Sequence, residues 1–79
     1  MEQLKTIKEL INQGDVAEAI RQLDEYLITD STDRDEAFYL LGNAYRKQGN
    51  WQLALNNYQY AIDLNPDSPA RCLLYTSPS

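Results

Sequence analysis

Residues 38–66 decide the fold of this 79-residue chain, and they read FYLLGNAYRKQGNWQLALNNYQYAIDLNP. Apolar residues recur here at intervals of three and four, which places them on one side of an α-helix. Gly49 interrupts the pattern and Pro66 ends it, because glycine adopts the left-handed conformation that closes a helix and proline cannot continue one. The stretch therefore predicts two helices joined by a tight turn.

The first half of the chain repeats this layout. It contains two more apolar stripes with helical spacing: Leu4, Ile7, Leu10 and Ile11, followed by Val16, Ala19, Ile20, Leu23 and Leu27. Gly14 lies 35 residues before Gly49, and Ala19 lies 35 residues before Ala54. Repetition is typical of helical solenoids, in which each helix pair covers the apolar face of the next. No segment alternates with period two, so we expect an all-α fold of two antiparallel helix pairs.

Acidic and amide residues stand where the helices are expected to begin. Asp15 and Asp33 precede the second and third helices. Glu18 and Glu36 follow them by three residues, which is an acidic variant of the capping box. Asn50 is the expected N-cap of the fourth helix.

Eight residues between positions 35 and 68 fall on one 34-residue pattern: Phe38, Leu41, Gly42, Tyr45, Ala54, Tyr58, Ala61 and Pro66. This pattern resembles the tetratricopeptide repeat (TPR), and it departs from that repeat only by exchanging one aromatic residue for another. The resemblance implies two TPR-like repeats stacked as a short right-handed solenoid. Gly42 and Ala54 fit it physically, because small residues let two helices approach closely. Trp51, Tyr58 and Tyr45 are expected in the core.

The resemblance also predicts the organisation of the chain. Residues 1–34 form a degenerate first repeat, in which Ile7 replaces the usual glycine, and residues 35–68 form a well-matched repeat. Residues 69–71 begin an interrupted capping helix, with Ser68 as its N-cap.

Residues 72–79 have no helical period and hold Cys72, the single cysteine of the chain. One back-translation of Cys72–Ser77, TGT CTC TTA TAC ACA TCT, resembles the transposase-recognised end of a sequencing-library adaptor. We therefore expect residues 72–79 to be an artefactual tail on a truncated fragment.

Composition excludes several classes of function. The chain has no histidine, which removes the commonest general base and metal ligand, so we expect neither an enzyme nor a cofactor or metal site. Its net charge of −5, concentrated as −6 in residues 1–36, opposes binding of nucleic acid and disfavours the RNA-binding pentatricopeptide alternative. No apolar stretch is long enough to span a bilayer, and no secretory signal is present, so we expect a cytoplasmic protein without membrane contact.

The resemblance implies that the protein binds a peptide segment of another protein on the concave face formed by the first helix of each repeat. Carried over by position, the peptide-binding residues are Glu36, Tyr39, Leu40, Asn43, Arg46 and Lys47. Most of them fall on a stripe displaced from the core stripe of the same helix. Asn43 can bond both groups of a peptide backbone, and the basic pair Arg46 and Lys47 favours an acidic side chain or a C-terminal carboxylate.

Lys8 and Asn12 do not align cleanly with the positions of a TPR carboxylate clamp, so chaperone binding is not predicted.

Two alternatives to peptide binding remain open, self-association and hydrolysis. The rival to peptide binding is self-association through the uncapped face of the terminal helix, which would give a homo-oligomer. A small hydrolase is a distant third, because histidine is missing.

Overall fold

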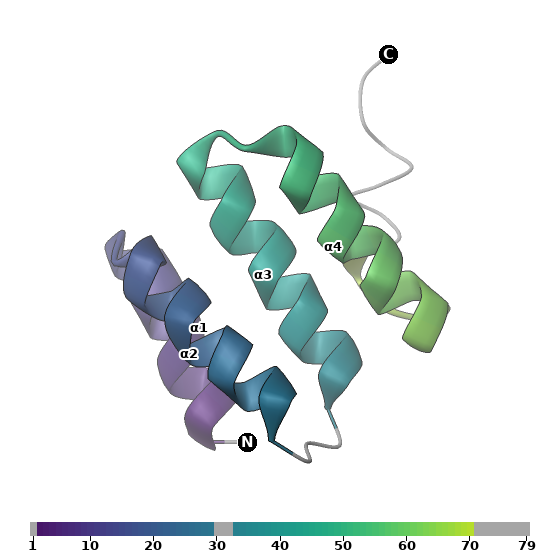
Figure 1. Ribbon diagram of the computed structural model, residues 1–79, viewed down its shortest axis with the longest axis horizontal. Coiled ribbons are helices and arrows are strands. Elements are labelled where there is room, and N and C mark those ends of the chain that lie inside the picture. The colour runs from purple at the N-terminus through teal and green to yellow at the C-terminus, as the bar shows by residue number, and fades with distance from the viewer. Residues whose placement is uncertain (1, 30–32, 71–79) are drawn as a thin grey trace.

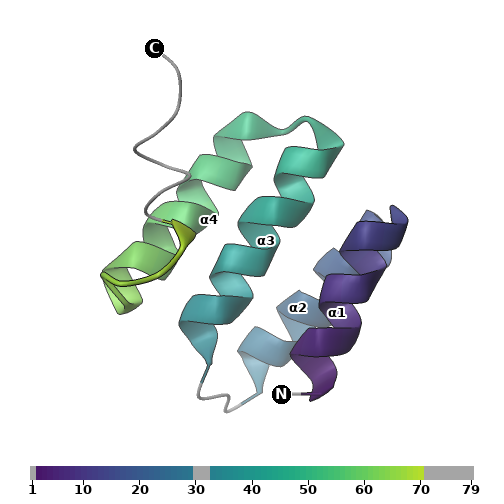
Figure 2. The same ribbon diagram turned by 180° about the vertical axis from the view of Figure 1, so that it is seen from behind.

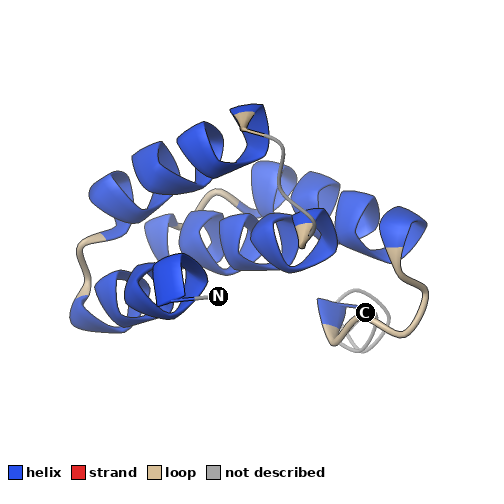
Figure 3. Cartoon of the chain, turned by 90° about the horizontal axis from the view of Figure 1, so that it is seen from below, coloured by secondary structure: helices blue, strands red, loops and turns tan. Residues whose placement is uncertain are grey.

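Four helices and their connections make up the part of the chain that the computed structural model describes, residues 2–29 and 33–70. The helices are α1 (Glu2–Gln13), α2 (Val16–Ile28), α3 (Arg34–Gln48) and α4 (Trp51–Leu64). No strand occurs within these two ranges (Figure 3). The all-α fold class and the two antiparallel helix pairs are therefore confirmed.

The turn between the helices of each pair is the same in both halves. Gly14 and Gly49 have φ angles of +92° and +83°, in the left-handed region that favours glycine. Asp15 N–H bonds to the Leu10 carbonyl at 2.8 Å, just as Asn50 N–H bonds to the carbonyl of Tyr45 at 2.9 Å. This six-residue closure satisfies the last carbonyls of a helix. The repeat seen in the sequence is thus a repeat of backbone geometry.

Helix α3 is the centre of the fold. Figures 1 and 2 show it between the α1/α2 pair on one side and α4 on the other. Its buried residues Ala37, Leu40, Leu41 and Ala44 join a core cluster with residues of α1 and α2: Leu4, Ile7, Ile11, Ala19, Leu23 and Tyr26. A second cluster covers the other side of α3 and contains Ala54, Tyr58, Ala61 and Ala70. Phe38, Tyr39 and Tyr45 pack against both clusters, which ties the two halves together.

Close packing between α3 and α4 depends on small residues. Ala54 and Ala61 are completely buried. A Cβ atom at Gly42 would lie 2.4 Å from Cε1 of Tyr58, so the tyrosine ring rests directly on the glycine backbone. The expected close approach at Gly42 and Ala54 is present.

Asp15 and Asp33 stand at the N-cap positions of α2 and α3, as expected, but the capping boxes predicted there are wrong. Asp15 and Asp33 make no side-chain capping bond. Glu18 instead binds Arg21 and Gln22 within α2, and Glu36 forms an ion pair with Lys8, so neither glutamate completes a capping box. The cationic and amide partners available to these carboxylates compete with the backbone. Asn50 does cap α4, because its Oδ1 accepts a bond from Leu53 N–H at 3.3 Å.

The prediction that Trp51 is a core residue is also wrong. Its side chain is 58% exposed, and Leu55 on the same flank of α4 is 38% exposed, whereas Tyr58 is 1% exposed. Helical spacing identifies an apolar stripe but not its buried width. Helix α3 covers only the middle of the stripe on α4, which leaves Trp51 at its edge.

The segment after α4 folds back toward the helix pair. Asn65 donates from Nδ2 to Asp35 Oδ2 at 3.0 Å, which links the end of α4 to the start of α3. Ser68 Oγ accepts from Ala70 N–H at 3.2 Å, as an N-cap does, and Ala70 is completely buried. The rest of the expected capping helix, and the expected tail at residues 72–79, lie outside the described residues.

No helix in the described ranges has the length and apolar character needed to cross a membrane.

Candidate functional site

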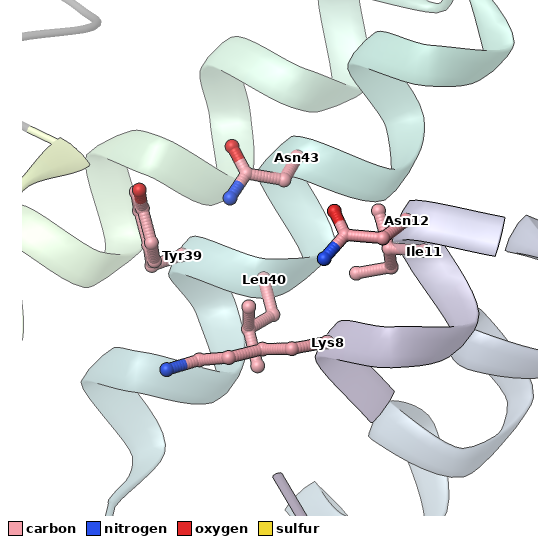
Figure 4. A pocket seen from close by; sticks show the side chains of 6 residues that line it. All are labelled: Lys8, Ile11, Asn12, Tyr39, Leu40 and Asn43. Carbon is pink, nitrogen blue, oxygen red and sulfur yellow. The ribbon is translucent and has the colours of Figure 1, made fainter. Parts of the chain in front are cut away.

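A pocket of about 290 Å³ opens between α1 and α3, the first helices of the two pairs. It is lined by Lys8, Ile11, Asn12, Tyr39, Leu40 and Asn43, and we call it the α1–α3 pocket (Figure 4). The lining follows from helical spacing, because residues three and four apart lie on the same face of a helix. Each helix thereby contributes one asparagine, Asn12 from α1 and Asn43 from α3.

The floor of the pocket is apolar. Leu40 is 2% exposed and Ile11 is 4% exposed, so both belong to the core while they line the pocket. Leu40 was expected as a groove-facing residue, and the structure gives it mainly a core position. Its side chain forms the bottom of the pocket and exposes little surface to a ligand.

Lys8 supplies the positive charge at the pocket. Its Nζ lies 2.9 Å from Glu36 Oε2, and both side chains are about half exposed. An ion pair this accessible to water contributes little to stability. Lys8 is therefore available to an incoming anionic or carbonyl group in exchange for Glu36.

Asn43 is held from behind by α4. The hydroxyl of Tyr58 donates to Asn43 Oδ1 at 2.6 Å, and Tyr58 is almost completely buried. Burial raises the pKa of Tyr58 above its usual value, so the phenol remains a hydrogen-bond donor at neutral pH. The Tyr39 ring lies beside it, with 6.2 Å between the ring centroids.

The six expected peptide-binding residues separate into two groups. Tyr39, Leu40 and Asn43 line the pocket, and Glu36 borders it through Lys8. Arg46 and Lys47 are exposed in the last turn of α3 and do not line it. Cations at this end of a helix interact favourably with its dipole, which gives both residues a structural role as well.

Lys8, Ile11 and Asn12 line the pocket but were not among the predicted binding residues, since Lys8 and Asn12 were weighed for a carboxylate clamp and set aside. The 35-residue repeat could have identified two of them, because Lys8 lies 35 residues before Asn43 and Asn12 lies 35 residues before Lys47. Asn43 and Lys47 are both predicted binding residues. The sequence prediction carried the binding positions onto the second repeat alone. The weak match of the first repeat concealed that its helix α1 forms the opposite wall.

This chain is similar to a protein family, to a solved structure and to curated relatives. The family model "Tetratricopeptide repeat" matches residues 35–68. The solution NMR structure of Bacteroides fragilis protein BF1650 is 63% identical, with a TM-score of 0.90, over 96% of this chain and 77% of that chain.

The curated relatives are photosystem I assembly proteins called Ycf3. Ycf3 of Synechococcus sp. (strain CC9902) is 42% identical over 64 residues, and that of Prochlorococcus marinus (strain MIT 9303) is 38% identical over the same length. Each alignment covers 78% of this chain but 36% of the relative. The chain thus spans only about a third of the length of these curated relatives.

Proposed function

Since this chain belongs to the tetratricopeptide repeat family, we propose that it is a non-catalytic module that binds a peptide segment of another protein in the α1–α3 pocket. One observation carries the proposal: Asn12 and Asn43 line the same pocket from two different helices. Carboxamides bond both the N–H and the C=O groups of an extended backbone. Two of them, one from each helix, can bond to one peptide strand at two points.

The surroundings of the pocket support the same function. Tyr39 adds a flat apolar surface with a polar tip, which suits a peptide side chain. Arg46 and Lys47 lie farther along α3 and extend the positive side of the groove, so an acidic residue of the peptide would find a partner there. The first half of the chain is acidic, so it disfavours the binding of strongly acidic partners to surfaces other than this groove.

The curated relatives are assembly proteins by name, and assembly depends on contacts between proteins. We extend this to the present chain as an adaptor or scaffold role, in the cytoplasm, with the partner recognised through an extended segment. The role requires no cofactor.

A peptide array tests the proposal. Labelled protein is applied to arrayed extended peptides, and Asn12→Ala is compared with Asn56→Ala, a matched change at an exposed asparagine of α4. Loss of one hydrogen bond predicts roughly 2- to 10-fold weaker binding for Asn12→Ala and no change for Asn56→Ala. Equal binding by both variants would move the site away from the pocket.

A second candidate function, self-association, is favoured by the exposed apolar side chains of α4. Trp51, Tyr60 and Leu64 are all more than half exposed, and Asp63 is the single charged residue of this helix. Charge repulsion therefore does not oppose contact between two copies of α4, although the chain carries a net charge of −5. Sedimentation velocity over a hundredfold concentration range tests it. A constant monomer mass would reject it, and a dimer abolished by Trp51→Glu would support it.

A further inference from the structure

One flank of α4 carries apolar side chains that α3 leaves uncovered. Leu53 is 38% exposed, Tyr60 and Leu64 are each 54% exposed, and Asn57 on the same flank is buried. These four residues follow one another at intervals of four, three and four. This is the spacing of the narrow seam along which two helices pack in a coiled coil. We call the four residues the α4 seam.

The α4 seam is separate from the flank of α4 that holds Trp51 and Leu55. With about 3.6 residues per turn, the two flanks fall on opposite edges of the buried stripe of this helix. The segment after α4 belongs to the Trp51 side, because Ala70 is buried in the cluster of Tyr58, against which Ile62 also packs. The described part of the chain therefore leaves the α4 seam open to a partner.

The seam is held in position by α3 and contains one unmet hydrogen-bond acceptor. The rings of Phe38 and Tyr60 lie 5.2 Å apart between centroids, so Tyr60 has a fixed neighbour although it is exposed. Asn57 donates from Nδ2 to the Leu53 carbonyl at 2.8 Å, while its Oδ1 accepts no hydrogen bond from the described residues. A buried acceptor without a donor costs free energy, which a donor supplied by a partner would recover.

The spacing of the α4 seam is the same when it is read in either direction along the helix. If two copies of α4 pack antiparallel about a two-fold axis, Leu53 of one copy therefore meets Leu64 of the other. Tyr60 of each copy then lies over Asn57 of the other, where its phenol can donate to the unmet Oδ1. Every contact occurs twice, as in any interface that a two-fold axis generates.

Charge favours the antiparallel arrangement. Asp63 is the single charged residue of α4, so a parallel pair would set two copies of this carboxylate side by side. The antiparallel pair places Asp63 beside Asn56 of the second copy, toward the positive N-terminal end of that helix. The excess negative charge of the chain lies in residues 1–36. Figures 1 and 2 show α1 and α2 on the other side of α3 from α4, so the acidic halves of two copies stay apart.

We propose that the α4 seam joins two copies of this chain as a closed two-fold dimer with antiparallel α4 helices. The inference rests on self-association, the second candidate function, and assigns it to the flank of Tyr60 rather than that of Trp51. One helix buries less than the roughly 1,200 Å² of a stable interface, so the dimer is transient, with a dissociation constant of about 0.1–1 mM. Helix α4 does not line the α1–α3 pocket, so the dimer presents two open pockets.

The direct test records contacts between copies in the full chain. Equal amounts of ¹³C-labelled and unlabelled protein are mixed at roughly the dissociation constant, about 1 mM, and an isotope-filtered nuclear Overhauser spectrum is collected. We expect contacts between the methyl groups of Leu53 in one copy and Leu64 in the other. Within one chain these residues are about 16 Å apart along the helix, too far to give this signal.

Sedimentation velocity then compares variants whose folding is verified by circular dichroism. Tyr60→Glu is expected to weaken the dimer about 10-fold or more, because it buries an unpaired charge in the seam. Gln52→Glu adds the same charge to the exposed polar face of α4 and is the matched control, with an expected change below about twofold. If Tyr60→Glu fails to fold, Leu64→Glu at the exposed end of α4 provides the same comparison.

Three results would overturn the inference: contacts of Leu53 with Leu53 in place of Leu64, equal weakening by Tyr60→Glu and Gln52→Glu, or a dimer that only Trp51→Glu abolishes. The last result would leave self-association standing and move it to the other flank of α4. If Trp51→Glu and Tyr60→Glu both weaken the dimer, the contact between Leu53 and Leu64 decides between the flanks. A monomer at every concentration would reject self-association together with the seam, and it would leave peptide binding in the α1–α3 pocket untouched.

Discussion

Gly42 and Tyr58 lie so close that a Cβ atom at position 42 would be 2.4 Å from Cε1 of the tyrosine ring. This contact sets the spacing of α3 and α4 behind the α1–α3 pocket. It also places the Tyr58 hydroxyl within 2.6 Å of Asn43 Oδ1. The packing of the second repeat and the geometry of the candidate site therefore depend on the same pair of residues.

Gly42→Leu is expected to destabilise the protein. Overpacking of a close helix contact costs about 1–3 kcal/mol or more, which exceeds the gain of about 1 kcal/mol from removing a glycine inside a helix. Thermal or urea unfolding measures the difference, with Ala17→Leu on the exposed face of α2 as the control. A Gly42→Leu variant as stable as the wild type would contradict the α3–α4 packing described above.

Trp51→Ala is expected to change the free energy of unfolding by no more than about 0.5 kcal/mol, because the side chain is 58% exposed. Tyr58→Ala should cost about 3–5 kcal/mol, as for other large buried aromatic residues. Urea unfolding of the two variants provides the comparison. Equal losses would mean that Trp51 is buried in solution, for instance by a second copy of the chain.

The stability of the protein should fall at alkaline pH through Tyr58. Burial raises the pKa of its phenol in the folded state, so the folded protein binds this proton more tightly than the unfolded chain. The stabilisation is complete below the ordinary pKa of 10.0 and is lost as the pH rises through the folded value. Unfolding measured between neutral pH and pH values above 10 should show this loss in the wild type. In Tyr58→Phe the loss should be smaller, and an identical pH profile would exclude Tyr58 as its source.

Glu18 should titrate well below the other carboxyl groups. Its hydrogen bonds with Arg21 and then Gln22 lower the pKa to about 2. The folded pKa is depressed, so the contribution to stability is present above the ordinary value of 4.5 and is lost as the pH falls toward about 2. Because the pair is exposed, the effect on stability is small. A carbon-detected NMR titration should show Arg21→Gln raising this pKa, and an unchanged midpoint would rule out the pairing.

Most of the fold could be predicted because it depends on local features. Gly14 and Gly49 close helices by the same backbone geometry, and this is visible as a 35-residue spacing. Small residues at Gly42 and Ala54 mark where helices approach. The capping boxes failed for a different reason, because Glu18 and Glu36 found cationic partners whose positions depend on side-chain geometry and on tertiary packing.

The candidate site was only half predictable. The α3 wall, with Tyr39 and Asn43, follows from the well-matched repeat, whereas the α1 wall belongs to a repeat whose pattern is poor. Lys8 and Asn12 become neighbours of Asn43 only when the two helix pairs stack. Trp51 shows the complementary limit, since periodicity places it on the apolar side of α4 but does not reveal how far α3 covers that side.

The central claim is that the α1–α3 pocket holds a peptide segment of a partner. Its most direct test is chemical-shift mapping of the ¹⁵N-labelled chain with the strongest peptide from the array. We expect the largest shifts at Lys8, Asn12 and Asn43, with Asn12→Ala reducing the affinity. Shifts confined to α4, at the Trp51 indole N–H and Leu55, with the pocket signals unmoved, would contradict the account.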